Sequence, residues 1–320
     1  MALSSAVFAA IYLAAGVYAE TVDQGTLLYT FSSGTDIENA VLRPNGQILM
    51  VSLTENVVYN LDPFAATPSP VVVATMPGVD SVQGITSIGD DKYAVTAGIR
   101  GDIYINETIF TIDLTQASNN GTATPETILV VPEAENFNGL VSLPTEPNVL
   151  LVADSVLGLI WRIDLEAKTA VEAISDDLMA LTTDSPTGVD LGIDGLKLYT
   201  DKATNQLYVY FTNVSKLLLA RVPILNNGSA ATGPSEIVAN QTGIDNWDDM
   251  AIAQNSSLIF GAMNPSYVQM LNITSGDAII VANMTTTSGP TSVVLADDGI
   301  HGYSFTRDGK VYEVTLPDYA

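Results

Sequence analysis

Polar side chains recur in this chain just before short apolar segments, and they are the residues best suited to chemistry. Carboxylate and amide oxygens that converge at one depth are the ligands a hard cation such as Ca²⁺ prefers. The alternative is structural: such groups could cap strand starts and hydrogen-bond to water. The positions are Glu38, Gln83, Asn138, Asp194, Asp248 with Asp249, and Ser288 to Thr291.

His301 is the only histidine and a separate candidate for catalysis, together with Asp248. A single histidine is more often a structural group than a catalytic one. The chain contains no cysteine, which excludes thiolate nucleophiles and, with a lone histidine, argues against a histidine–cysteine metal centre. A Ser-His-Asp triad stays open, although no Gly-x-Ser-x-Gly motif is present.

A repeated unit must position these residues. Six closing segments of similar pattern end at Leu61, Ile112, Ile163, Val222, Leu271 and Val314, which are 43 to 59 residues apart. Strand-forming units with periods of about 40–50 residues are typical of propeller blades. An additional apolar segment, 26–31, has no partner nearby and is expected to complete the last blade. The sequence therefore predicts an all-β, six-bladed β-propeller, closed by pairing of the N-terminal strand with the last blade.

The first residues have the pattern of an export signal. Residues 6–15 are apolar, and Val17-Tyr18-Ala19 is a small-x-small cleavage pattern before Glu20. We therefore expect a signal peptide at 1–19 and one propeller domain at 20–320, in a secreted or secretory-lumen protein. Eight glycosylation sequons support this expectation. They begin at Asn106, Asn120, Asn213, Asn227, Asn240, Asn255, Asn272 and Asn283.

The net charge of the chain limits the classes of molecule that it is expected to bind. The net charge is −25, with only 11 Lys plus Arg, so the surface should repel phosphate backbones and anionic lipids. No basic cluster and no apolar run long enough to span a bilayer is present. Nucleic acid and a membrane span are therefore not expected, and a small apolar molecule is the favoured partner. The oligomeric state cannot be predicted.

Glu38, Asn138 followed by Gly139, and Asp248-Asp249 open blades one, three and five, and this arrangement resembles the SMP-30/gluconolactonase-like family. The resemblance implies a divalent cation, Ca²⁺ or Zn²⁺, in the channel and hydrolysis of a lactone with help from the aspartate. The implied metal ligands are Glu38, Asn138, Asp194 and Asp248. Family members usually carry Asn at the position of Asp194 and Gly at that of Asp249.

The chain also resembles a second branch of this fold, the fungal secreted hetero-Diels–Alderases of tropolone-sesquiterpenoid pathways. That resemblance implies cycloaddition of a tropolone- or phenol-derived o-quinone methide to a humulene-type terpene, with no cofactor required. An apolar cavity would hold both partners in a reactive arrangement, and polar groups would polarise the quinone methide. The expected substrate-binding residues are Phe137, Trp247, Asp249, Met263 and Tyr303.

Three functional classes therefore remain: a pericyclase, a metal-dependent lactonase or related hydrolase, and a non-catalytic ligand-binding propeller. The predicted secretion, the sequons, the apolar composition and the departures at Asp194 and Asp249 favour the pericyclase.

Overall fold

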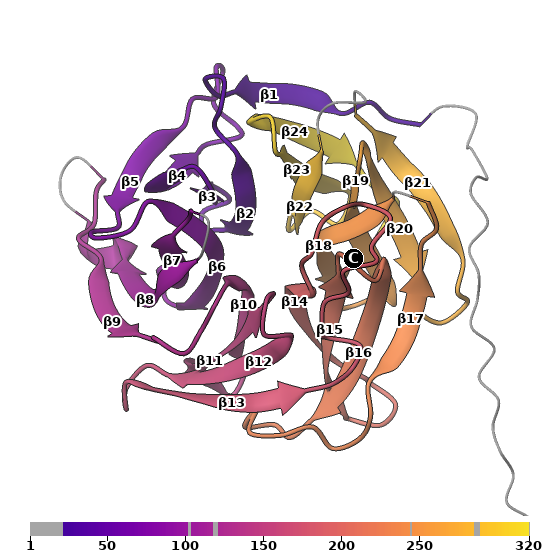
Figure 1. Cartoon of the computed structure of the whole chain (residues 1–320). Helices are drawn as coiled ribbons and strands as arrows, with labels where there is room; N and C mark the ends of the chain where they lie inside the picture. Colours follow the sequence, from indigo (N-terminus) through magenta and orange to yellow (C-terminus); the bar gives the residue numbers. More distant parts are fainter. Residues whose placement is uncertain (1–21, 102–103, 118–120, 244, 285–288, 320) are drawn as a thin grey trace, which may run out of the picture.

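The computed structural model describes residues 22–101, 104–117, 121–243, 245–284 and 289–319. These residues form six four-stranded antiparallel sheets arranged as a ring (Figure 1). The only helical element assigned within them is a short 3-10 helix, η1 (Leu114–Gln116). The prediction of an all-β six-bladed propeller is confirmed.

Each blade runs from an inner strand at the channel to an outer strand at the rim. Blades 1 to 3 contain β2 (Ile37–Leu42), β3 (Ile48–Ser52), β4 (Glu55–Leu61) and β5 (Val71–Thr75); β6 (Ser81–Gly89), β7 (Lys92–Ile99), β8 (Ile105–Asp113) and β9 (Glu126–Val130); and β10 (Phe137–Leu143), β11 (Glu146–Asp154), β12 (Leu159–Asp164) and β13 (Thr169–Ser175). Blades 4 to 6 contain β14 (Ile193–Thr200), β15 (Leu207–Asn213), β16 (Leu218–Ile224) and β17 (Glu236–Asn240); β18 (Asn246–Ala253), β19 (Leu258–Asn264), β20 (Tyr267–Asn272) and β21 (Ala278–Asn283); and β22 (Pro290–Leu295), β23 (His301–Thr306), β24 (Lys310–Thr315) and β1 (Thr26–Thr30).

The sixth blade contains strands from both ends of the chain. β1 pairs antiparallel with β24, with Thr26 opposite Glu313 and Thr30 opposite Lys310, and the two strands lie side by side in Figure 1. The expected signal peptide, residues 1–19, lies outside the described residues.

A turn at Pro44-Asn45-Gly46 connects β2 to β3. Arg43 donates its backbone N–H to the Gln47 carbonyl at 2.7 Å, which closes the hairpin. Gly46 has φ +82°, a conformation that glycine adopts without the steric cost of a side chain. Such tight turns return each strand against its neighbour and keep the blades narrow.

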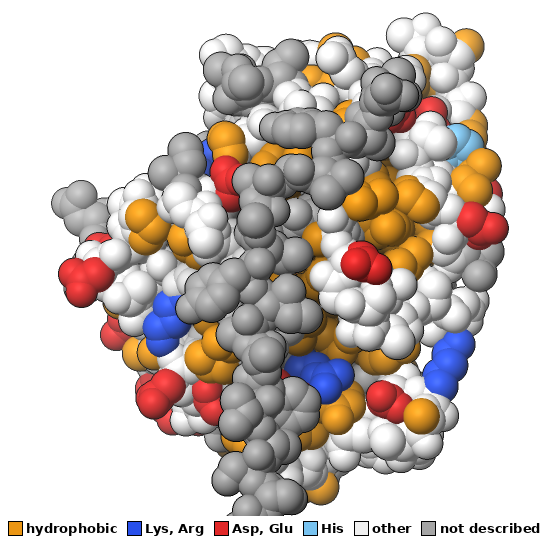
Figure 2. All heavy atoms as spheres, turned by 90° about the vertical axis from the view of Figure 1, so that its right-hand side faces the viewer, with side chains coloured by type: hydrophobic (Ala, Val, Ile, Leu, Met, Phe, Trp, Pro, Cys, Tyr) orange, Lys and Arg blue, Asp and Glu red, His pale blue; other side chains and the backbone are white. Residues whose placement is uncertain are grey.

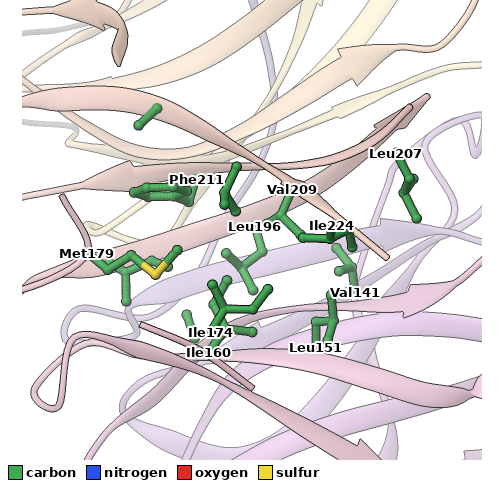
Figure 3. Packing of buried hydrophobic residues seen from close by; sticks show 14 of the residues in the cluster. Val141, Leu151, Ile160, Ile174, Met179, Leu196, Leu207, Val209, Phe211 and Ile224 are labelled. Carbon is green, nitrogen blue, oxygen red and sulfur yellow. The ribbon is translucent and has the colours of Figure 1, made fainter. Parts of the chain in front are cut away.

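The hydrophobic core lies between adjacent blades. Figure 3 shows the cluster between blades 3 and 4, where Val141 and Leu151 meet Leu196 and Phe211. Met179 packs in the same cluster although it belongs to a connection rather than to a strand, and it is fully buried. Removal of this apolar surface from water stabilises the blade-to-blade contacts.

The surface drawn in Figure 2 carries scattered acidic side chains and few basic ones. This agrees with the net charge of −25. No helix formed by the described residues has the length and apolar character required to cross a bilayer.

Candidate functional site

Every inner strand has a register shift close to its start, and the first residue within each shift has a polar side chain. These residues are all buried. A bulge of this kind changes the direction in which a side chain points, away from the regular in–out alternation. The residues at the shifts are Glu38, Gln83, Asn138, Asp194, Asp248 and Thr291.

Glycine follows three of these residues because neighbouring inner strands approach each other closely. A Cβ on Gly139 would lie 2.5 Å from the carbonyl oxygen of Asp194, and a Cβ on Gly195 would lie 2.3 Å from Oδ1 of Asp249. No side chain fits at such distances. The Asn138-Gly139 and Asp194-Gly195 pairs therefore combine a polar side chain at the channel with room for the next blade.

Four of the ring residues line one cavity of about 400 Å³: Glu38, Asn138, Asp194 and Asp248. Two arginines, Arg100 and Arg307, are part of the same wall, as are Asn246 and Asn264. The remaining lining is largely aliphatic or small and includes Leu53, Val189, Leu191, Val214 and Pro265. The volume lies within the range of about 300–1,000 Å³ that is usual for small-molecule sites.

The carboxyl groups of the cavity accept two sets of hydrogen bonds. The Asn138 amide donates to Oδ1 of Asp194 and, at 3.5 Å, to Oε1 of Glu38. Oδ2 of Asp248 accepts from the Asn264 amide at 2.9 Å and from the Arg307 guanidinium at 3.1 Å. The second oxygen of Glu38, Oε2, is buried without a hydrogen-bond partner among the described residues.

Burial makes these carboxyl groups unusually weak acids. It raises the pKa of Glu38, Asp194 and Asp248, and repulsion between neighbouring carboxylates raises the pKa of all three further, while Arg307 opposes the effect. Burial, followed by the charge of Glu38, also raises the pKa of the adjacent Asp36 to about 7. Carboxyl groups in this set therefore keep protons well above the pH at which an exposed aspartate ionises, and they can donate hydrogen bonds.

The cation implied by the family resemblance does not fit the side chains as they are placed. Among the described residues, no group of three or more Asp, Glu or His side chains is arranged to hold a metal ion. The Asn138 amide connects Glu38 to Asp194, and Asp248 is engaged by a guanidinium. The four expected metal ligands thus line one cavity, but their carboxylate oxygens accept hydrogen bonds from the Asn138 amide and the Arg307 guanidinium.

The apolar residues expected to contact substrate lie in the protein interior. Phe137, Trp247, Met263 and Tyr303 are 1% exposed or less and pack in the hydrophobic clusters, and none is among the residues that line the cavity. The Trp247 ring covers Gly261 so closely that a Cβ there would lie 2.1 Å from it. Phe137 and Trp247 directly precede the polar residues at the register shifts of β10 and β18, whereas Met263 and Tyr303 belong to the middle strands β19 and β23.

Asp249 also lies outside the cavity. Both of its carboxylate oxygens accept from the Lys197 ammonium, at 2.8 and 2.7 Å, and its side chain is 5% exposed. This carboxylate occupies the position that glycine holds in blades 2 to 4, and it bridges blade 5 to blade 4. The extra charge noted in the sequence is therefore neutralised by a cation next to it.

His301 is not at the cavity. It begins β23, whereas Arg307 follows the opposite end of the same strand and lines the cavity. Its Nδ1 lies 2.5 Å from Oδ2 of Asp298, and its side chain is 34% exposed; the pale-blue histidine is visible on the outer surface in Figure 2. The structure thus separates the two expected catalytic residues, because only Asp248 lines the cavity.

Sequence reasoning missed Arg100, Arg307 and Asn264. A signal was available for Arg307, which begins the Arg307-Asp308-Gly309 turn and is one of only 11 basic residues. In an acidic chain, basic residues in turns on the channel side deserve inspection as partners for buried carboxylates.

The glycosylation sequons occupy different environments. The Asn213 side chain is fully buried and donates to the carbonyls of Leu178, Met179 and Ala180, at 2.9, 3.2 and 3.0 Å. A glycan on that nitrogen is incompatible with these contacts, so the prediction for Asn213 conflicts with the fold. Asn120 lies outside the described residues. The exposed sequon residues are Asn106, Asn227, Asn255 and Asn283, and the half-buried ones are Asn240 and Asn272.

Comparison with known proteins adds two sequence relatives. No family model matches the chain. It is 26% identical over 294 residues to the "Putative hetero-Diels-Alderase" of Phoma sp., which covers 83% of this chain and 81% of that protein. It is 24% identical over 253 residues to the "Putative hetero-Diels-Alderase asR5" of Sarocladium schorii, which covers 71% of this chain but 60% of that protein.

Solved structures show the same fold at low sequence identity. The calcium-binding protein regucalcin of Agrobacterium tumefaciens has a TM-score of 0.60 at 15% identity, covering 92% of this chain and 97% of its own. The PQQ-bound aldose sugar dehydrogenase of Streptomyces coelicolor has a TM-score of 0.60 at 14% identity, covering 91% and 97%. The resemblance noted in the sequence is thus supported at two levels: the chain shares its propeller fold with regucalcin and aldose sugar dehydrogenase, and it is similar in sequence to proteins named as hetero-Diels-Alderases.

Proposed function

We propose that this protein catalyses a hetero-Diels–Alder cycloaddition between an o-quinone methide and an alkene of a humulene-type terpene. The observation that carries the proposal is the cavity itself, which is lined by weakly acidic, buried carboxyl groups, by two arginines and by aliphatic side chains. The similarity to two proteins named for this reaction supports it. The signal-peptide pattern and the sequons make secretion part of the same proposal.

The reaction makes limited demands on the protein. The quinone-methide oxygen forms a C–O bond to one alkene carbon, and the exocyclic methylene carbon forms a C–C bond to the other. The quinone-methide C=O, its exocyclic C=C and the alkene C=C become single bonds. A new six-membered dihydropyran ring forms, and the original ring of the quinone methide regains its aromatic character. No atom is lost and no oxidant or reductant is consumed, so no cofactor is required. Holding both partners together removes much of the entropic barrier of a bimolecular step.

The cavity's own residues would accelerate this step by donating to the quinone-methide oxygen. A hydrogen bond to that oxygen withdraws electron density from the heterodiene and makes its methylene carbon more electrophilic. Protonated Asp194 is the best-suited donor: burial and the nearby charges of Asp248 and Glu38 raise its pKa, and no arginine donates to it. Asp248, which accepts from Arg307, would hold that guanidinium at the same wall.

Lactone hydrolysis assisted by a metal ion is less well supported. It would require Glu38, Asn138, Asp194 and Asp248 to present oxygens to one cation, whereas these side chains bond to one another and to Arg307. We derive no step through a metal from this arrangement.

The test is incubation of the purified protein with humulene and a quinone-methide precursor, followed by chiral chromatography. We expect one enriched stereoisomer, and we expect its rate of formation to fall about 10²-fold to 10³-fold in the Asp194→Asn variant, as when an oxyanion-hole donor is removed. Asp298→Asn, on the opposite face, is the matched control and should leave the rate unchanged.

A product mixture identical to the protein-free control would contradict the proposal for these substrates. Metal-dependent opening of a lactone in a parallel panel would then favour the hydrolase. Binding of the terpene or the quinone-methide precursor without turnover would favour the binding propeller.

A further inference from the structure

One of the six connections that lead from an outer strand to the next inner strand is about three times as long as the others. The connection between β13 and β14 comprises residues 176–192, whereas the other five comprise five or six residues each. We call residues 176–192 the long connection. Loops of this length within a compact domain are uncommon and usually functional.

Both ends of the long connection are fixed to blade 4. Asn213 donates to three of its carbonyls, Met179 is buried in the hydrophobic core, and Ser215 accepts through Oγ from the Thr182 amide at 2.9 Å. At the other end, the backbone of Ser215 donates to the Leu191 carbonyl at 2.9 Å. The burial of Asn213, which conflicts with its sequon, therefore has a structural purpose.

The middle of the long connection is held differently. The hydrogen bonds described for residues 183–190 stay within the connection, for example from Gly188 to the Ser185 carbonyl and from Thr187 to the Ser185 hydroxyl. No hydrogen bond described for these residues joins them to another part of the chain. A segment tied at both ends and free of outside hydrogen bonds between them can move with little cost.

Side chains of this segment alternate between the cavity and solvent. Thr187, Val189 and Leu191 are half-buried and line the cavity, whereas Pro186 and Asp190 are exposed. Val214 extends the same apolar wall, because its backbone N–H donates to the Gly192 carbonyl at 3.2 Å. Blade 4 thus contributes an aliphatic wall to the rim of the cavity.

The charged part of the rim lies on the other side of the ring. Arg100 follows β7 of blade 2 and Arg307 follows β23 of blade 6, the two neighbours of blade 1. Blade 4 stands opposite blade 1 (Figure 1). The aliphatic side chains of the long connection and the two arginines therefore come from opposite parts of the ring, while Asp194 of β14 and Asp248 of β18 add polar groups to the same cavity.

From this arrangement we propose that the long connection forms a hydrocarbon-binding flap, in which Val189 and Leu191 are the specificity-determining residues for the apolar partner. The proposal deepens the proposed function, on which it rests, by assigning the terpene to the aliphatic side chains of the long connection and the oxygenated partner to the polar side chains of the cavity, Asp194, Arg100 and Arg307. Contact with aliphatic side chains gives affinity in proportion to the apolar area removed from water.

The test compares two double variants of the same segment. Val189→Ser/Leu191→Ser changes the side chains that face the cavity, and Pro186→Ser/Asp190→Ser changes those that face solvent. Binding of Nile red, an uncharged apolar dye, is measured by fluorescence, with humulene as competitor. We expect about tenfold weaker binding in the first variant and less than twofold change in the second, in proportion to the buried apolar area lost.

Equal binding in both variants and the parent protein, or equal loss in both variants, would overturn the inference. The single variant Val189→Ser, which leaves Leu191 and its adjoining backbone bonds in place, provides a second measurement if the double variant does not fold. It should weaken binding about threefold.

Dye binding does not require turnover, so the inference and the proposed function can fail separately. If cycloaddition is absent but the two double variants differ as expected, the result supports the flap and contradicts the proposed reaction. If cycloaddition occurs, the KM for the terpene should rise about tenfold in Val189→Ser/Leu191→Ser while the KM for the quinone-methide precursor is unchanged. An equal change in both constants would overturn the flap and leave the reaction in place.

Discussion

On inner strands that reach the cavity, a residue of the hydrophobic core and a residue of the cavity wall are neighbours in the sequence. Trp247 is packed in the core, and the next residue, Asp248, lines the cavity. Phe137 and Asn138 show the same division in blade 3. In each pair the first residue stabilises the contact between blades and the second is available for chemistry. The comparison teaches that proximity in sequence to a channel residue does not place a side chain in the channel.

The strongest test of this division is Trp247→Ala. Truncation of a large, fully buried aromatic ring should cost about 3–5 kcal/mol of unfolding free energy, because a cavity remains above Gly261. Urea unfolding would measure it, with Leu27→Ala, at a half-exposed position, as the control. If Trp247 were a substrate wall, the variant would instead lose product selectivity with little loss of stability.

A buried carboxyl group away from the cavity gives the second test. Burial raises the pKa of Glu107 from 4.5 to about 8, and the charge of Asp154 adds to the effect. The unfolded chain binds fewer protons than the folded chain between these values, so stability should fall as pH rises from 4.5 to 8. In the parent protein, ionisation of Glu107 should lower the free energy of unfolding by up to about 4 kcal/mol over that range, and the Glu107→Gln variant should lack this decrease.

The control for Glu107 is Glu126→Gln, an exposed substitution that should alter the unfolding free energy by less than about 0.5 kcal/mol. Unfolding in urea at pH 5 and pH 8 would separate the two variants. A pH dependence that is the same in Glu107→Gln as in the parent protein would show that Glu107 is already ionised in the folded state.

Arg307→Gln tests the channel side of the division. The substitution removes the guanidinium that donates to Asp248 and opposes the repulsion among the cavity carboxyls. We expect about tenfold slower cycloaddition, as for the loss of one charge-assisted hydrogen bond at an oxygen-binding wall. Thermal unfolding at the assay pH is the check that the variant remains folded, because the buried Asp248 loses one of its donors. Unchanged kinetics would place the oxygenated partner elsewhere in the cavity.

His301→Gln should have the smallest effect. His301 lies at the end of β23 away from the cavity, and its described side-chain partner is Asp298. The rate of cycloaddition should therefore stay within about twofold of the parent protein, since surface substitutions rarely have larger effects. A loss comparable to that of Asp194→Asn would mean that the reaction takes place on the opposite face.

The fold was largely predictable from the sequence because the blade pattern repeats six times. The polar residues of the ring were predictable as well, since Glu38, Asn138, Asp194 and Asp248 each occur at a strand start and four blades converge. The sequence did not show the direction in which each side chain points. Trp247 and Tyr303 were expected at the channel on residue type, but both side chains are buried in the hydrophobic clusters. His301 was selected because it is unique, whereas the useful side chain on that strand, Arg307, follows its other end.

The length of the connection between β13 and β14 could be interpreted only once the strand boundaries were known. The long connection could be identified as unusual only by comparison with five short ones. The role of Asn213 could not be predicted for a similar reason. A sequon at the end of a strand is typical of a surface site, whereas the Asn213 amide donates to the carbonyls of residues 178–180, which belong to another part of the chain.

The proposed mechanism requires that burial, which raises the pKa of Asp194, keep a proton on this carboxyl group so that it can donate to an oxygen of the substrate. Infrared difference spectroscopy of the parent protein and Asp194→Asn at pH 7 tests it most directly. The account predicts a C=O stretching band of a protonated carboxylic acid in the parent protein that is absent in the variant. A parent spectrum in which Asp194 contributes only carboxylate bands would contradict the account.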